Sequence, residues 1–291
     1  MESYRGKIPE PLGNPTLRRI GFPAHSDKNC PTMAALLLIP FSYAFLSRYR
    51  EDMPFYLTIE YAPALLITLL FGKFGTLENL ASYFVSFLAF ISIYEIGYLV
   101  NDYVSIKWEN KPRLRGVMAA TGPLLVAWTA SRLATFYLVS LYLAPRVGAA
   151  YWLFFAFLSL IFAAHNLLKR KEFKVCTFYW LSVCRFVCST IWHVDRHTLT
   201  ELLVAGTILY SGFRLLGYLE SKELLFLPNR KSSEFRLLYY SLPLPLAVAL
   251  ALGGRLSPFP VLAGYYFLCA ILATLLGRRS QASQAVAEGN G

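Results

Sequence analysis

Charged residues are scarce in this 291-residue chain, and acidic residues are scarcer than basic ones. Only 15% of the residues are charged, and 17 acidic residues stand against 28 basic ones, for a formal net charge of +11. Soluble domains usually carry about 25% charged residues. The composition therefore excludes an ordinary soluble globular protein.

Cysteine and histidine are also few, with five and four residues. The cysteines are scattered and never form a CxxC pair, so no disulfide framework is indicated. His193 and His197 stand four apart with only Asp195 beside them, so a structural role for His193 is preferred to a zinc site. The first 30 residues lack the order of a cleaved signal peptide, and the apolar segments that follow are expected to be retained.

Long apolar runs fill most of the chain. Hydrophobic residues make up 56% of it, and its mean hydropathy is +0.46. Because a helical span needs about 20 residues, we predict an all-α polytopic membrane protein with eight spans. They lie near 56–72, 79–101, 117–143, 149–168, 175–193, 199–219, 235–252 and 258–276. The segment 33–47 is short and contains Pro40, so we expect it to insert halfway; a ninth span is the alternative.

The remaining regions flank this transmembrane domain, 33–277. Repeated prolines predict an irregular N-terminal arm over 1–32, and the polar composition of 278–291 predicts a disordered tail. The alternate connections between the spans fall into two sets. One set, with the C-terminal tail, holds 16 Lys and Arg residues, and the other set holds four; the first set consists of 48–55, 102–116, 169–174 and 220–236. Positively charged loops stay inside. We therefore expect both termini and the charged loops on the cytoplasmic side.

The most informative stretch is the polar end of the second predicted span. Asn101, Asp102, Ser105 and Glu109 would share one face of a continuing helix. Carboxylate and amide oxygens at a water-facing helix end suit Mg²⁺, which proteins bind with one or two carboxylates plus substrate phosphates. The alternative is a polar helix end at the interface without a ligand.

Ionisable residues inside apolar segments are a second signal, because a charge at membrane depth is costly and faces a bundle interior or a wet cavity. Arg185 and Arg214 are the preferred functional residues, since guanidinium forks match phosphate oxygens. Arg132 and Glu60 are expected to be structural. After the sixth span, the carboxylates of Glu220 and Glu223 could share a helix face, with Lys222 and Arg230 near them.

These motifs resemble those of the UbiA superfamily of intramembrane prenyltransferases, in which NDxxDxxxD ends the second helix and a second acidic motif ends the sixth. Here the matching residues are Asn101, Asp102 and Glu109, and Ser105 stands at the middle aspartate. The branch that looks closest is the decaprenyl-phosphate phosphoribosyltransferases. The stretches that carry this second likeness are YLVND at 98–102, LKR at 168–170, Arg185, KEL at 222–224 and RLLYY at 236–240.

The resemblance implies a UbiA-like bundle of eight or nine helices and a transferase acting on a polyprenyl phosphate or diphosphate, with phosphoribosyl diphosphate as one donor. It implies Mg²⁺ as cofactor, held by Asn101, Asp102, Glu109 and Glu223. Catalytic roles are expected for Asp102, Lys169 and Arg185. Substrate contacts are expected for Asn101, Lys107, Arg113, Arg170, Arg214, Lys222 and Arg236. The expected partners are the lipid, a diphosphate-bearing small molecule and the membrane, with no nucleic acid.

Two other functions stay open. The first is prenyl transfer from a prenyl diphosphate to an aromatic or lipid acceptor. The second is a non-catalytic descendant that binds lipid or acts as a scaffold, which Ser105 at the aspartate position favours.

Overall fold

The computed structural model describes residues 31–50, 52–104, 120–254 and 256–289, with side chains described between 33 and 277. Most of the predicted arm, 1–32, lies outside these ranges, and so does part of the loop after the second span. The prediction for the arm therefore stays a prediction. The stretch predicted as a disordered tail, 278–291, is instead helical as far as Gly289, as the end of the helix that begins at Pro258.

Seven helices in the described part of the chain are long and apolar enough to cross a membrane, which confirms the all-α polytopic fold. They are Met53–Phe71, Thr76–Tyr103 (α5), Gly122–Val147 (α6), Ala149–Leu167 (α7), Arg196–Ser221, Ser233–Leu252 and Pro258–Gly277. Each corresponds to a span expected from the sequence. The last belongs to a longer helix, α13 (Pro258–Gly289).

Three of these spans consist of shorter pieces. The first contains α3 (Met53–Tyr56), the π-helical η2 (Leu57–Tyr61) and α4 (Ala62–Phe71). Another contains α9 (Arg196–Ala205), the π-helical η4 (Gly206–Gly212) and α10 (Phe213–Ser221). A third contains α11 (Ser233–Ser241) and α12 (Leu244–Leu252), which Pro243 separates.

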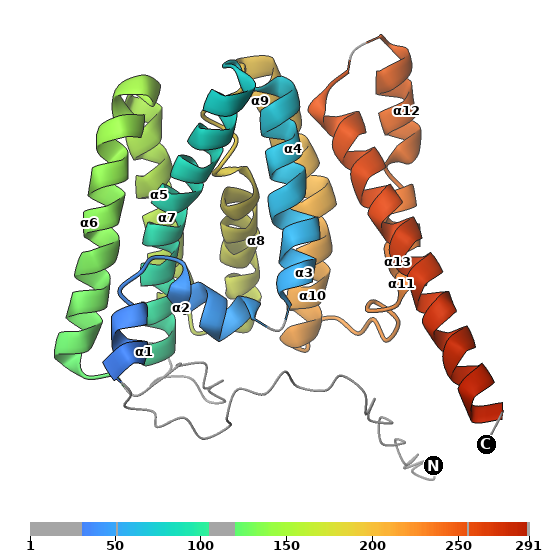
Figure 1. Ribbon diagram of the computed structural model, residues 1–291, viewed down its shortest axis with the longest axis horizontal. Coiled ribbons are helices and arrows are strands. Elements are labelled where there is room, and N and C mark those ends of the chain that lie inside the picture. The colour runs from blue at the N-terminus through green and yellow to red at the C-terminus, as the bar shows by residue number, and fades with distance from the viewer. Residues whose placement is uncertain (1–30, 51, 105–119, 255, 290–291) are drawn as a thin grey trace.

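The remaining predicted span, 175–193, corresponds to α8 (Lys171–Val187). This helix has 17 residues, and nearly all of its second half is buried. It lies in the centre of the bundle against α7, α10 and η4 (Figure 1). Because neighbouring helices shield it from lipid, α8 does not need an apolar surface all round. It can therefore carry polar residues, Arg185 among them, at membrane depth.

The segment before the first span forms a re-entrant hairpin, residues 31–50, that does not cross the bundle. It contains α1 (Pro31–Leu36), α2 (Ser42–Ala44) and the π-helical η1 (Phe45–Tyr49). The chain turns at Phe41, whose φ is 77°. Figure 1 shows α1 and α2 at the lower end of the bundle. The segment does not cross the bundle, as Pro40 and the short apolar run predict, and its half-insertion into the membrane stays a prediction.

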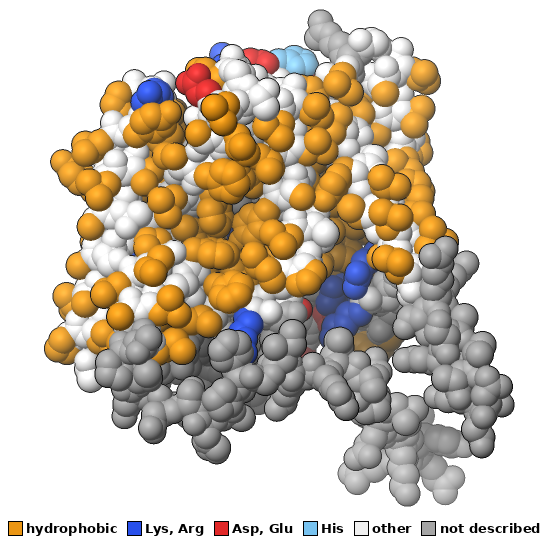
Figure 2. All heavy atoms as spheres, viewed as in Figure 1, with side chains coloured by type: hydrophobic (Ala, Val, Ile, Leu, Met, Phe, Trp, Pro, Cys, Tyr) orange, Lys and Arg blue, Asp and Glu red, His pale blue; other side chains and the backbone are white. Residues whose placement is uncertain are grey.

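The basic connections gather at one end of the molecule. Helices α5, α7 and α10 end, and α6, α8 and α11 begin, at the lower end of the bundle (Figure 1). Apolar side chains cover the sides, and Lys and Arg side chains appear in a recess toward the lower end (Figure 2). The side of the membrane that this end faces stays a prediction from the loop charges.

Two apolar clusters hold the bundle together. The first joins α4, α9, η4 and α13 and includes Tyr210 and Tyr266. The second joins η1, α5, α7 and α8 and includes Tyr49 and Tyr94. Both clusters are rich in tyrosine, and the site described below lies where tyrosines of the two clusters meet charged side chains.

We expect Gly97→Leu to destabilise the protein strongly, because Gly97 is a point of close approach between α5 and α7. A Cβ atom there would lie 2.4 Å from ring atoms of Phe162. Overpacking of this kind costs about 1–3 kcal/mol, and more when the neighbour cannot move. Thermal unfolding in detergent measures the loss. Gly264→Leu in α13 is the control, since nothing lies within 4 Å of a Cβ there. Equal losses in the two variants would contradict the prediction.

Candidate functional site

Three π-helical segments supply the centre of the site. A π turn widens the helix locally, and such turns are frequent at functional sites. Here η1 contains Arg48, η2 contains Glu60 and η4 contains Tyr210. With α5 and α8 between them, these segments bring charged side chains from distant parts of the sequence together.

Glu60 is the negative centre of one half of the site. Its side chain is 3% exposed, and its Oε1 accepts a hydrogen bond of 2.6 Å from Nε of Arg185. Its Oε2 accepts a 2.5 Å bond from the Tyr210 hydroxyl and lies 3.5 Å from Nη1 of Arg214. One buried carboxylate thus faces two guanidinium groups.

The guanidinium of Arg185 lies among tyrosine rings. Its Cζ is 4.8, 5.0 and 5.8 Å from the ring centroids of Tyr49, Tyr56 and Tyr94. These distances are within the range of cation–π attraction. Nη1 donates to the Tyr98 hydroxyl at 3.3 Å, whereas the buried Nη2 has no hydrogen-bond partner among the described residues. A buried N–H donor of a charged group normally has a partner, so this nitrogen marks a place where a ligand acceptor would fit.

Arg214 extends the site toward its exposed side. Its side chain is 16% exposed, more than the side chains of Glu60 and Arg185. Its Nη1 donates to the Tyr210 hydroxyl at 3.2 Å, and its Cζ lies 5.5 Å from the ring centroid of Tyr56. Arg214 is therefore the more accessible of these two guanidinium groups.

Asp102, at the end of α5, is the negative centre of the other half. It accepts a two-pronged pair of bonds from Arg48, at 2.8 Å to Oδ2 and 2.7 Å to Oδ1. The Tyr43 hydroxyl donates to Oδ2 at 2.7 Å, and the Asn101 amide donates to Oδ1 at 3.0 Å. Burial, and then the charge of Asp102, raise the pKa of Tyr43 well above its usual range. The Tyr43 hydroxyl therefore stays protonated and donates a hydrogen bond to Asp102.

Tyr98 connects the two halves. Its hydroxyl receives the bond from Arg185, and the Cζ of Arg48 lies 3.9 Å from its ring centroid. We call Arg48, Asp102, Glu60, Arg185 and Arg214 the arginine cluster. Its formal charges, three positive and two negative, leave an excess of one positive charge.

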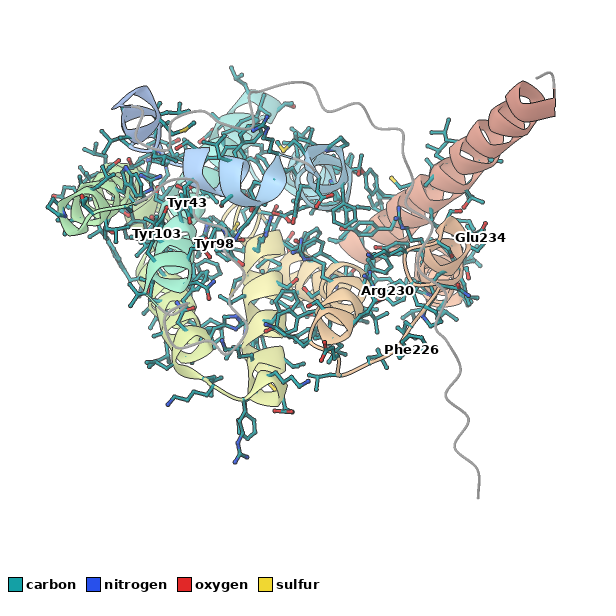
Figure 3. The ribbon with its side chains drawn as sticks, turned by 90° about the horizontal axis from the view of Figure 1, so that it is seen from below. Tyr43, Tyr98, Tyr103, Phe226, Arg230 and Glu234 are labelled. Atoms are coloured by element: carbon teal, nitrogen blue, oxygen red, sulfur yellow. The ribbon has the colours of Figure 1, made fainter. Side chains whose placement is uncertain are left out.

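A view from below locates the cluster relative to the polar stretch 220–236, which follows the sixth predicted span. Tyr43 and Tyr98 lie close together at the lower end of α5 (Figure 3). Phe226, Arg230 and Glu234 lie on the opposite side of the bundle, on the α10–α11 connection and the start of α11. The arginine cluster and the stretch 220–236 therefore share one end of the bundle but lie apart from each other there.

The predicted site residues fall into three groups. Asn101, Asp102, Arg185 and Arg214 meet in or beside the arginine cluster. The second group lies in the α7–α8 and α10–α11 connections and in α11, and none of its members belongs to the arginine cluster: Lys169, Arg170, Lys222, Glu223 and Arg236. The third group lies outside the described residues: Lys107, Glu109 and Arg113.

The shared face expected for Glu220 and Glu223 is not formed. Helix α10 ends at Ser221, and Glu223 is exposed with a φ of 60°, a left-handed conformation. Glu220 instead accepts a 2.6 Å bond from Nε of Arg230. A spacing of three brings side chains together only while the helix continues, and here it stops between the two residues.

The fit of Mg²⁺ can be judged at Asp102. An ionised carboxylate offers about four lone-pair positions, and Asp102 already accepts four hydrogen bonds from Arg48, Tyr43 and Asn101. Within the described ranges, no three His, Cys, Asp or Glu residues form a group that could hold a metal ion. Asp102 in this arrangement therefore does not fit a cation. A cation held at Glu109 stays a prediction.

Motif analysis misses two residues of the candidate site, Arg48 and Glu60. Arg48 belongs to no recognisable motif. Its only signal in the sequence is that Arg48 and Arg50 follow an apolar segment. Glu60 is identified as an intramembrane carboxylate but expected to be structural. Its contacts with two guanidinium groups put it inside the site.

Comparison with known proteins finds no relative of this chain. No family model matches it, and neither a curated protein nor a solved structure is similar to it at a significant level.

Proposed function

We propose that this chain is a UbiA-like intramembrane transferase that acts on a polyprenyl phosphate, whose phosphate group binds at Arg185 and Arg214. The observation that carries the proposal is the buried Nη2 of Arg185, which has no hydrogen-bond partner in the part of the chain that the structure describes. Two guanidinium groups on adjacent helices suit a phosphate, because the planar fork matches phosphate oxygens.

The charge of the arginine cluster supports an anionic ligand. Three guanidinium groups face two carboxylates among the buried or nearly buried residues. An excess positive charge at this depth is costly when it has no counter-charge. A phosphate monoester would supply that charge, and its lipid tail would lie along the apolar surface of the helices.

The reaction that the resemblance implies is substitution at a carbon that carries a diphosphate. An oxygen of the lipid phosphate forms a bond to C1 of the ribose, and the bond from that carbon to the pyrophosphate oxygen breaks, with the electron pair leaving on pyrophosphate. Arg185 and Arg214 would orient the lipid phosphate and reduce its charge. The resemblance also implies Mg²⁺, which would neutralise charge on the departing pyrophosphate.

A second function is favoured by one observation. Arg48, Tyr43 and Asn101 use every acceptor position of Asp102, the residue that the superfamily motif would assign to catalysis. A descendant that binds the lipid phosphate without transferring anything would keep the arginine cluster and need no free carboxylate there.

Binding of polyprenyl phosphate to the protein in lipid nanodiscs tests the proposal. We expect Arg185→Gln to weaken binding at least about tenfold, which is about 1.4 kcal/mol, because it removes the unpartnered donor and one charge. Arg185→Lys should retain part of the affinity, because it keeps the charge without the fork. Pyrophosphate release from phosphoribosyl diphosphate then separates the transferase from the lipid-binding protein.

Arg146→Gln is the matched control. Arg146 is exposed and lies near the C-terminal end of α6, far from the arginine cluster. Its Cζ is 3.7 Å from the ring centroid of Tyr142. Equal loss of binding in Arg146→Gln and Arg185→Gln would mean that the lipid responds to overall charge and not to the cluster.

A further inference from the structure

Asp102, which lies in the part of the UbiA-like motif that the structure describes, is paired with an arginine. Both guanidinium Nη atoms of Arg48 bind Asp102, and the pair is shielded, with side chains 9% and 1% exposed. A two-pronged pair of this kind combines charge neutralisation with fixed geometry. Arg48 thus already supplies the positive charge that a divalent cation would otherwise supply to Asp102.

Arg48 is held in place by contacts that do not involve the site. Its Nη1 also donates to Ser47 Oγ at 2.8 Å, and Ser47 donates to the carbonyl of Tyr43 at 2.6 Å. Glu95 of α5 also fixes the hairpin, because it accepts hydrogen bonds from the backbone N–H groups of Phe41 and Ala44. The guanidinium is therefore positioned by the fold of the hairpin before any ligand arrives.

Arg48 also borders the place where the phosphate would bind. Its guanidinium stacks on Tyr98, and the hydroxyl of the same tyrosine receives the bond from Arg185. A positive charge at Arg48 acts across one aromatic ring on an anion at Arg185. Because the surroundings exclude water, this attraction is stronger than it would be in solution.

Resting on the function proposed above, we propose that Arg48 replaces the divalent cation at Asp102, so that the site binds the phosphate group of its lipid without a metal ion. Arg48 supplies positive charge beside the ligand, and Asp102 is its fixed counter-ion. The site then requires no dehydration of Mg²⁺, which gives up its water ligands reluctantly.

Binding of geranylgeranyl phosphate to the protein in nanodiscs, measured in EDTA and in millimolar Mg²⁺, tests this inference. For the wild-type protein we expect the two Kd values to agree within about twofold. Arg48→Ala should bind at least about tenfold more weakly in EDTA and recover much of that loss in Mg²⁺, because Asp102 is then free to bind the cation.

Arg48→Ala combined with Asp102→Asn provides the internal control, because it leaves no unpaired buried charge and no carboxylate for a metal. It should bind less weakly than Arg48→Ala does in EDTA, because no uncompensated carboxylate repels the phosphate, and it should show no response to Mg²⁺. A wild-type Kd that rises more than about tenfold in EDTA would overturn the inference, and so would Arg48→Ala that folds but ignores Mg²⁺. Failure of the wild-type protein to bind the probe in either buffer would instead overturn the proposed function.

Discussion

Arg132→Ala is expected to cause a large loss of stability, because it breaks an ion pair in the interior of the bundle. Arg132 and Glu95 are fully buried between α6 and α5, with Nη2 and Oε2 3.0 Å apart. Removal of one partner of a buried ion pair costs about 3–5 kcal/mol, because the other charge is left without compensation. The variant would also lose its bonds to the carbonyls of Leu37 and Ile39, which fix the re-entrant hairpin.

Thermal unfolding in detergent measures this effect, and a paired substitution gives the reason for it. Arg132→Met combined with Glu95→Gln leaves no buried charge, and the glutamine oxygen can still accept from a backbone N–H of the hairpin. We expect the double variant to recover most of the stability that Arg132→Ala loses. If the double variant were as unstable as the single one, the pair would contribute through packing and not through charge.

The fold is largely predictable because its signal is local. Apolar runs of about 20 residues mark the spans, and seven of the eight appear as helices long and apolar enough to cross. Pro40 and the shortness of 33–47 predict the half-inserted hairpin. The bounds of α8 are harder to predict, since a helix shielded by neighbours tolerates polar residues that mark an end elsewhere, and Lys171 and Lys174 lie inside it.

The candidate site is only half predictable, because its partners come from distant segments. Arg185 and Arg214 stand out as charges inside apolar segments, and Asp102 stands out by its motif. Neither signal predicts that Arg48 pairs with Asp102, since 54 residues separate them and the hairpin has no regular period. The spacing of Glu220 and Glu223 misleads, because it assumes a helix that ends at Ser221.

Buried carboxylates in this bundle therefore differ in role although their sequence contexts look alike. Glu95 has one arginine and two backbone N–H groups, which fix a hairpin. Glu60 contacts two arginines, and Nη2 of one of them, Arg185, has no hydrogen-bond partner within the described ranges. The charges of Glu95 and Arg132 balance each other, whereas the two arginines at Glu60 could bind a further anion. This difference can be measured.

Glu60→Gln is expected to tighten binding of a phosphate lipid while it lowers the stability of the unliganded protein. Glutamine has nearly the same shape and removes one negative charge, so the excess charge of the arginine cluster rises from one to two. Attraction between unit charges a few ångströms apart is worth several kcal/mol at intermediate dielectric. We expect an affinity for geranylgeranyl phosphate roughly tenfold higher or more. The bound phosphate would then take the place of the carboxylate between Arg185 and Arg214.

The shift of the thermal midpoint with lipid provides the measurement, because a ligand that binds the folded state stabilises it in proportion to RT ln(1 + [L]/Kd). The shift caused by the lipid should be larger in Glu60→Gln than in the wild-type protein, although the unliganded variant starts from a lower midpoint. Glu95→Gln is the matched control: it removes an equally buried carboxylate from an arginine outside the cluster, and its lipid-induced shift should equal that of the wild-type protein. If Glu60→Gln lowers stability without increasing the shift, Glu60 is a structural partner of Arg185 and the phosphate does not bind between the two arginines.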